Sequence, residues 1–132
     1  MPKPPVPARF QAVLANPNPC VIAAVKPSGA PVTVATWYLW EDGRLLVNMD
    51  EGRKRLDYLR EDPRVSLTVL DTDDWLRAIS LRGRVASLED DTDLADIDRL
   101  ARRYTGRPYR NRSRGRVSAW IEVAEWHAWG FG

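Results

Sequence analysis

The segment VNMDEGRKRL, residues 47–56, joins a β-type run to a helix that begins with three consecutive cations, Arg53, Lys54 and Arg55. Amides in the first turn of a helix lack partners within the helix, and the helix dipole favours negative charge there. Guanidinium and ammonium groups beside such amides form a good clamp for a phosphate. The segment therefore predicts a phosphate-binding corner directly after a strand. A surface helix with a solvated basic first turn is the alternative.

The composition is typical of a single globular domain. The chain has 132 residues, of which 44% are hydrophobic and 29% charged, and this length suffices to bury one core. No apolar run approaches the ~20 residues that cross a bilayer, and the N-terminus lacks the apolar region of a signal peptide. We therefore expect a cytoplasmic protein without a membrane partner. Cys20 is the only cysteine, which excludes an internal disulfide, and without a Cys/His cluster we expect no metal site.

Positive charge is concentrated in one part of the chain. The net charge is only +2, but residues 99–116 contain eight arginines and no acidic residue. Such a segment suits nucleic acid, a ligand with several carboxylates or phosphates, or solvent alone. It lacks the regular aromatic residues of single-strand binders, so we expect no nucleic-acid partner.

The pattern of elements predicts a small β-barrel. Residues 1–8 are rich in proline and predict a flexible tail, which leaves residues 9–132 as one domain. Helices are expected at about residues 7–16, at 52–61 and after the capping residues 90–93. Strands are expected at residues 20–25, 31–40, 45–48, 65–70, 75–87 and 118–129. Six strands, joined largely by hairpins, predict a mainly β antiparallel fold with flanking helices.

Several short motifs, taken together, carry a resemblance to a known family. In chain order they are GAP (29–31), VATWY (34–38), DGR (42–44), RKR (53–55), DPRVSL (62–67), GRV (83–85) and YTGRPY (104–109). Over about residues 13–130 the chain is similar to the pyridoxamine 5'-phosphate oxidase-like (PPOX class) family of FMN-binding split β-barrels. More narrowly, it resembles the probable oxidoreductases that depend on the deazaflavin coenzyme F420.

The resemblance implies a six-stranded antiparallel split barrel that forms a homodimer, with two equivalent cofactor clefts at the subunit interface. It assigns Arg53, Lys54 and Arg55 to the cofactor phosphate, Asn48, Met49 and Asp50 to the phosphate-bearing side chain, and Ala35 and Thr36 to the ring system. Members often carry proline at the position of Ala35 and lysine at that of Arg55. Arginine keeps the charge but changes the hydrogen-bond geometry at the phosphate.

The activity implied by the resemblance is hydride transfer between reduced F420 and an electron-poor organic substrate, with the cofactor supplying the hydride chemistry. No catalytic residue is identified. Candidate proton donors are His127, Tyr58, Tyr104 and Tyr109, and the pattern distinguishes none of them from solvent.

Three alternatives remain at this point: an FMN-binding oxidase or reductase of the same fold, a non-enzymatic F420 carrier, and a nucleic-acid-binding module. For F420, we expect Arg110, Arg112 and Arg114 to hold its acidic polyglutamate tail, because no acidic residue lies near them in the sequence.

Overall fold

One antiparallel β-sheet with helices around it forms the protein, described here over residues 1–132 by a computed structural model. The elements are α1 (Ala8–Leu14), β1 (Cys20–Val25), β2 (Pro31–Thr36), β3 (Leu39–Glu41), β4 (Arg44–Asp50), α2 (Lys54–Glu61), β5 (Arg64–Asp71), β6 (Asp74–Asp90), the 3-10 turn η1 (Thr92–Leu94), α3 (Ala95–Thr105) and β7 (Arg116–Trp129). None of the helices combines the length and the apolar character needed to span a bilayer. The predicted mainly β antiparallel class is confirmed.

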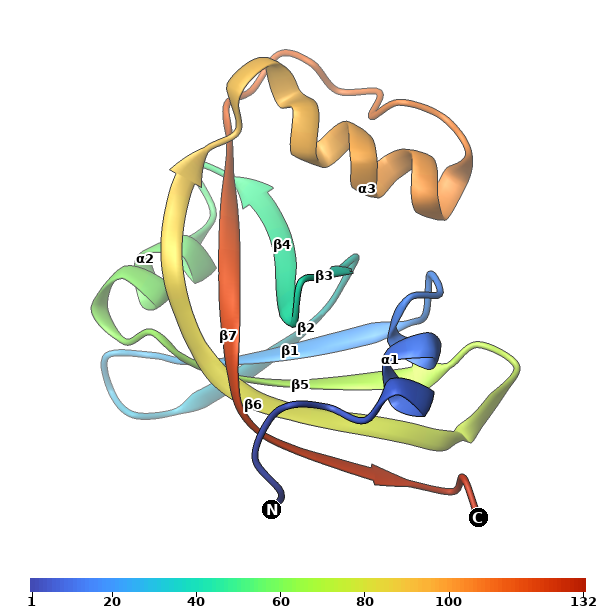
Figure 1. The fold of residues 1–132 in the computed structure, drawn as a ribbon. Helices are drawn as coiled ribbons and strands as arrows, with labels where there is room; N and C mark the ends of the chain where they lie inside the picture. Colours follow the sequence, from blue (N-terminus) through green and yellow to red (C-terminus); the bar gives the residue numbers. More distant parts are fainter.

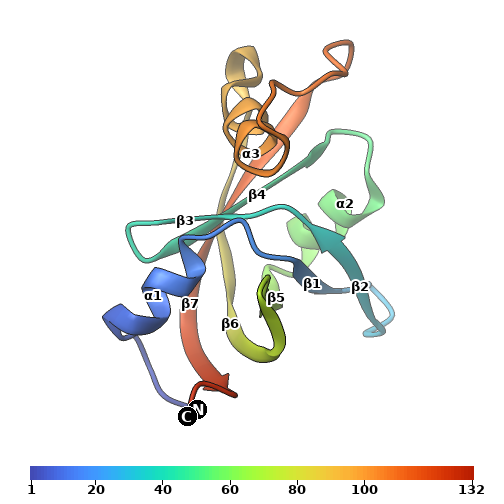
Figure 2. The same cartoon turned by 90° about the vertical axis from the view of Figure 1, so that its right-hand side faces the viewer.

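The sheet bends into two crossing layers. Its strand order is β2-β1-β5-β6-β7-β4-β3. Figure 1 shows β1 and β5 running across the lower part of the molecule, while β4 and β7 rise steeply above them towards α3. Turned by 90°, Figure 2 shows α2 beside β1 and β2 and α1 on the other side of the barrel. The two layers enclose an apolar core.

The long strand β6 connects the two layers. It pairs with β5 through its first part and with β7 along most of its length, with register shifts next to Gly83 and after Val85. A Cβ atom at Gly83 would lie only 1.9 Å from the carbonyl oxygen of Glu122 in β7. Glycine therefore permits a close approach of the two backbones where the sheet changes direction.

The expected strand at residues 31–40 is broken in two, so the sheet has seven strands rather than six. β2 pairs with β1, whereas β3 pairs with β4 in the other layer. Trp37 and Tyr38 lie between them, and the Tyr38 side chain is fully buried. The break results from the anchoring of Tyr38 by residues distant in the sequence. The β-type composition of this stretch therefore gave no sign of it.

A buried hydrogen-bond network anchors Tyr38. Its hydroxyl donates to the carbonyl oxygen of Leu14 at 2.8 Å and accepts from Asn18 Nδ2 at 3.1 Å. Arg103 of α3 donates to the Tyr38 carbonyl oxygen at 3.2 Å and to that of Ala15, at the end of α1, at 2.6 Å. A cation near the last carbonyls of a helix also suits the helix dipole. The network thus ties α1, the β2–β3 connection and α3 together.

The proline-rich N-terminal segment lies against the barrel. The carbonyl oxygen of Pro2 accepts from the Trp126 amide at 2.9 Å, and that of Lys3 accepts from the Trp126 indole at 3.2 Å. Val6 belongs to the buried core. The segment is therefore placed against β7 rather than as a free tail, while its mobility in solution stays a prediction.

Replacing Tyr38 with Phe tests the anchoring network. Tyr38→Phe removes the hydroxyl and leaves buried partners such as Asn18 Nδ2 without one of their hydrogen bonds, so we expect the free energy of unfolding to fall by about 1–3 kcal/mol. Urea denaturation measures the change. The control is Tyr58→Phe on α2, whose hydroxyl has no hydrogen bond within the protein. Equal stabilities of the two variants would contradict the anchoring role.

Candidate functional site

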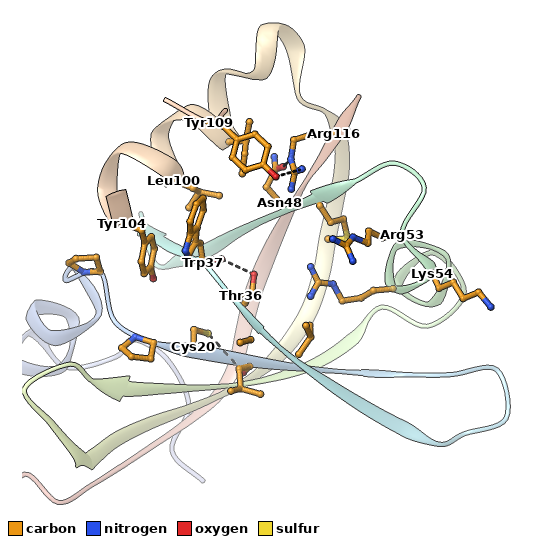
Figure 3. Close-up of a pocket in the computed structure, with 18 of the residues that line it drawn as sticks. Cys20, Thr36, Trp37, Asn48, Arg53, Lys54, Leu100, Tyr104, Tyr109 and Arg116 are labelled. Carbon is orange, nitrogen blue, oxygen red and sulfur yellow. Dashed lines mark hydrogen bonds between the residues drawn. The ribbon is translucent and has the colours of Figure 1, made fainter. Parts of the chain in front are cut away.

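A large cavity lies between the two layers, α3 and the start of α2. Its volume is about 960 Å³. The lining residues are Pro17, Pro19, Cys20, Val21, Val34, Ala35, Thr36, Trp37, Asn48, Met49, Gly52, Arg53, Lys54, Arg55, Thr72, Ile97, Leu100, Tyr104, Tyr109 and Arg116. Figure 3 shows arginines gathered on one side and Trp37 and Tyr104 on the other. The cavity therefore has a cationic end and an aromatic end, and it is large enough for a small organic ligand.

The cationic corner is formed by Arg53, Arg55 and Arg116. Arg55 is half-buried, and its Nε is fully buried without any hydrogen-bond partner. Burial is the main cause that lowers the pKa of Arg55, and repulsion by Arg53 and Arg116 lowers it further. A buried charge without a partner is costly, and an anion at this corner would supply the missing acceptor. No side chain caps the first turn of α2, which begins here.

Arg116 is the one cation of the corner whose side chain makes several hydrogen bonds, and that side chain is only 9% exposed. Its Nε donates to Asn48 Oδ1 at 2.7 Å, and its Nη1 donates to Asp50 Oδ1 at 2.7 Å and to the Tyr109 hydroxyl at 3.2 Å. The Arg116 guanidinium also lies 4.7 Å from the centre of the Tyr109 ring. Sequence reasoning placed Arg116 within the arginine-rich segment but did not single it out.

A buried polar network supports Asn48. Asn48 Nδ2 donates to Asp91 Oδ2 at 3.0 Å and to Ser118 Oγ at 3.1 Å. The Asp91 carboxylate in turn accepts from the amides of Asp96 and Ile97 at the start of α3, so it fills the capping role predicted for residues 90–93. This network fixes α3 and β4 relative to each other, and both elements line the cavity.

The aromatic end is built around Trp37. Its ring stacks on Tyr104, with centroids 5.5 Å apart and planes 9° from parallel, and meets Tyr109 edge-on at 6.3 Å and 89°. Burial raises the pKa of Tyr104 to about 12 and that of the Cys20 thiol to about 12. Both groups are therefore neutral near pH 7, and Cys20 is a buried wall residue rather than a nucleophile.

The residues that the sequence assigned to a cofactor converge on this cavity, with one exception. Ala35, Thr36, Asn48, Met49, Arg53, Lys54 and Arg55 all line it. Asp50 does not line the cavity. Its carboxylate pairs with Arg116 at 2.7 Å and lies 3.7 Å from Arg53. Lys54 reaches away from the other cations in Figure 3. The binding roles of these residues stay predictions.

Two further expectations are changed by the structure. Of the candidate proton donors, His127 and Tyr58 do not line the cavity, and the Tyr104 hydroxyl is engaged as a donor to the Asn18 carbonyl oxygen at 2.7 Å. Arg112 is not free, because it forms two hydrogen bonds to Asp98 at 2.9 and 3.0 Å. The expectation that Arg112 lacks a counter-charge was therefore wrong: its acidic partner lies on α3, distant in sequence.

Comparison with known proteins assigns the family. Residues 6–130 match the sequence profile of pyridoxamine 5'-phosphate oxidase. The chain belongs to the pyridoxamine 5'-phosphate oxidase family. Members of this family are oxidoreductases that depend on a flavin or on the deazaflavin F420. A search of curated proteins finds no match.

Solved structures of similar proteins share the fold. One, described as an F420 reductase, is 26% identical over 92% of this chain and 98% of its own, with a TM-score of 0.83. The conserved hypothetical protein Rv2991 of Mycobacterium tuberculosis is 23% identical over 96% of this chain and 86% of its own, with a TM-score of 0.74. General Stress Protein 26 of Bacillus anthracis is 19% identical over 91% and 90%, with a TM-score of 0.68. The fold is thus the split barrel of this family.

The unpaired Arg55 makes a direct test of the cationic corner possible. We expect Arg55→Met to weaken the binding of inorganic pyrophosphate by about tenfold, because a charge-assisted hydrogen bond in a partly buried site is lost. Lys54→Met removes the same charge one residue away and should change affinity much less, since Lys54 points away from the corner. Calorimetric titration of the two variants and the parent protein with pyrophosphate measures these affinities. Equal losses of affinity in the two variants would show a general electrostatic effect instead of a specific site at Arg55.

Proposed function

We propose that the protein is a reductase that uses reduced F420 to transfer a hydride to an electron-poor organic substrate. The observation that carries this proposal is the half-buried Arg55 with its unpartnered Nε, next to Arg53 and at one end of an otherwise largely apolar cavity. A phosphate on an elongated, flat cofactor fits that combination of anion site and apolar wall. Further support is the likeness to a structure described as an F420 reductase, over nearly the whole of both chains.

Each part of the cavity has a role in this proposal. Arg53 and Arg55 hold the phosphate, and Asn48 and Met49 lie along the chain that bears it. Ala35 and Thr36 of β2 support the ring system, where small side chains leave room for a flat group. When bound, the reduced deazaflavin supplies the hydride. The protein supplies orientation, a fixed electrostatic field and the exclusion of water.

A second copy of the chain completes the site in this proposal. Val21 and Val34 line the cavity and remain 37% and 43% exposed, so they offer apolar surface beside it. A homodimer that covers them would close the cavity and shield the cofactor from water. The same cover would give two equivalent sites across one two-fold axis.

Side-by-side titration with F420 and FMN tests the cofactor. We expect F420 to bind at least about tenfold more tightly than FMN, a difference of about 1.4 kcal/mol. Quenching of the fluorescence of each cofactor by the purified protein measures both affinities. Tighter binding of FMN would favour a flavin oxidase or reductase of the same fold. Tight binding of F420 without turnover of any enone, quinone or tetrapyrrole would favour a carrier.

The arginine-rich loop before β7 gives a second test, specific to the acidic tail of F420. Arg110 and Arg114 are exposed and lack a paired carboxylate, and Arg114 Nη2 lies 3.9 Å from where a Cβ would sit on the cavity residue Gly52. We expect Arg110→Gln with Arg114→Gln to weaken F420 binding about tenfold at low salt and less at high salt, because exposed charges are screened.

The charge-matched control is the double variant Arg82→Gln with Arg84→Gln on β6. Neither of these arginines lines the cavity. FMN has no such tail, so its affinity should be almost equal in both double variants. A loss of F420 affinity that is equally large in the control, or that does not depend on salt, would exclude a specific role of the loop.

A further inference from the structure

Two hydrogen-bond donors in the cavity wall are unused by the protein. The Tyr109 hydroxyl accepts from Arg116 Nη1 at 3.2 Å, but its own proton has no acceptor among the protein's groups. Arg116 donates through Nε and Nη1, whereas its Nη2 has no protein acceptor. Both residues line the cavity, where Arg116 belongs to the cationic corner and Tyr109 packs between it and Trp37 of the aromatic end. Arg116 Nη2 is not among the fully buried atoms without a partner, so it is open to the cavity, where a ligand oxygen can accept from it and from the Tyr109 hydroxyl.

The surroundings hold this pair rigidly. Arg116 is fixed by Asn48 and Asp50, and the Tyr109 amide donates to Asp98 Oδ1 at 2.9 Å. The Tyr109 ring is packed against the Arg116 guanidinium on its face and against Trp37 at 89°. Because Asp50 already neutralises much of the Arg116 charge, the pair suits an oxygen with partial negative charge better than a full anion.

We propose that Tyr109 and Arg116 form a subsite that binds the carbonyl oxygen of a flat conjugated substrate, with Tyr109 as its proton donor. This inference rests on the proposed function for its redox step. The ring of the substrate lies against the aromatic wall of Trp37, and its oxygen receives hydrogen bonds from the Tyr109 hydroxyl and from Arg116 Nη2.

The substrate gains one hydride and one proton in this step. A hydride, with its two electrons, reaches a carbon of the conjugated system from the reduced deazaflavin, and negative charge moves to the carbonyl oxygen. The O–H bond of Tyr109 breaks and a new O–H bond forms on that oxygen. The tyrosinate that remains lies beside the Arg116 guanidinium and takes a proton from water. Tyr109 is the one candidate donor whose hydroxyl proton is free at the cavity.

The test uses the cofactor-free protein and two neutral probes, 2-acetonaphthone and 2-ethylnaphthalene, which differ in the carbonyl oxygen. We expect Tyr109→Phe to weaken binding of the ketone by about fivefold and to leave the hydrocarbon unchanged, because one hydrogen bond is lost and the ring is kept. Tyr58→Phe, outside the cavity, should change neither. Titration calorimetry gives all affinities, and urea denaturation checks that both variants fold.

The outcomes separate this inference from the choice of cofactor. Equal loss for both probes, no loss for the ketone, or no saturable ketone binding in the parent protein would overturn the subsite, whatever F420 does. A ketone-specific loss would support it even if the protein bound FMN instead. In the loaded enzyme, Tyr109→Phe should lower kcat about 100-fold with a conjugated ketone, typical of a lost general acid.

Discussion

The position of one guanidinium, that of Arg116, governs how the cavity is built. Its side chain is 9% exposed, so its charge has to be paired within the protein. Asp50 and Asn48 of β4 provide the partners, and Asn48 is itself held by Asp91, which caps α3. A single chain of hydrogen bonds therefore connects β7, β4 and α3, which all line the cavity. Displacing any member would move a wall of the site as well as a strand.

Local patterns were sufficient for most of the fold. Turn residues and β-branched runs placed β1 within its observed bounds, and the Asp62–Pro63 pair ended α2 as expected. The break after β2 escaped prediction because the residues around Trp37 and Tyr38 have strand character throughout. What interrupts the strand is the burial of Tyr38 against α1 and α3, and such a contact between distant segments leaves no periodic signal in the sequence.

In the candidate site too, local features were predictable from sequence and long-range contacts were not. Cations that follow a strand within a few residues could be found from sequence, because their clustering is local. Arg116 could not, since its partner Asp50 is far away in the sequence and seven other arginines share its segment. The pairing of Arg112 with Asp98 shows the converse error. Residues 99–116 contain no acidic residue, yet Arg112 has a counter-charge, because Asp98 of α3 lies against the loop.

Arg116 has a carboxylate partner and Arg55 has none, and this difference affects the expected affinity for an anion. Arg116 is neutralised by Asp50, whereas Arg55 keeps a buried Nε without an acceptor and a pKa lowered chiefly by burial. In the free protein this arrangement costs stability, through lost hydration and repulsion between guanidinium groups. In the proposed function, a bound phosphate would remove both costs at once, and its affinity would include relief of this destabilisation in addition to the direct hydrogen bonds. This relief supports the proposed role of the corner as an anion site.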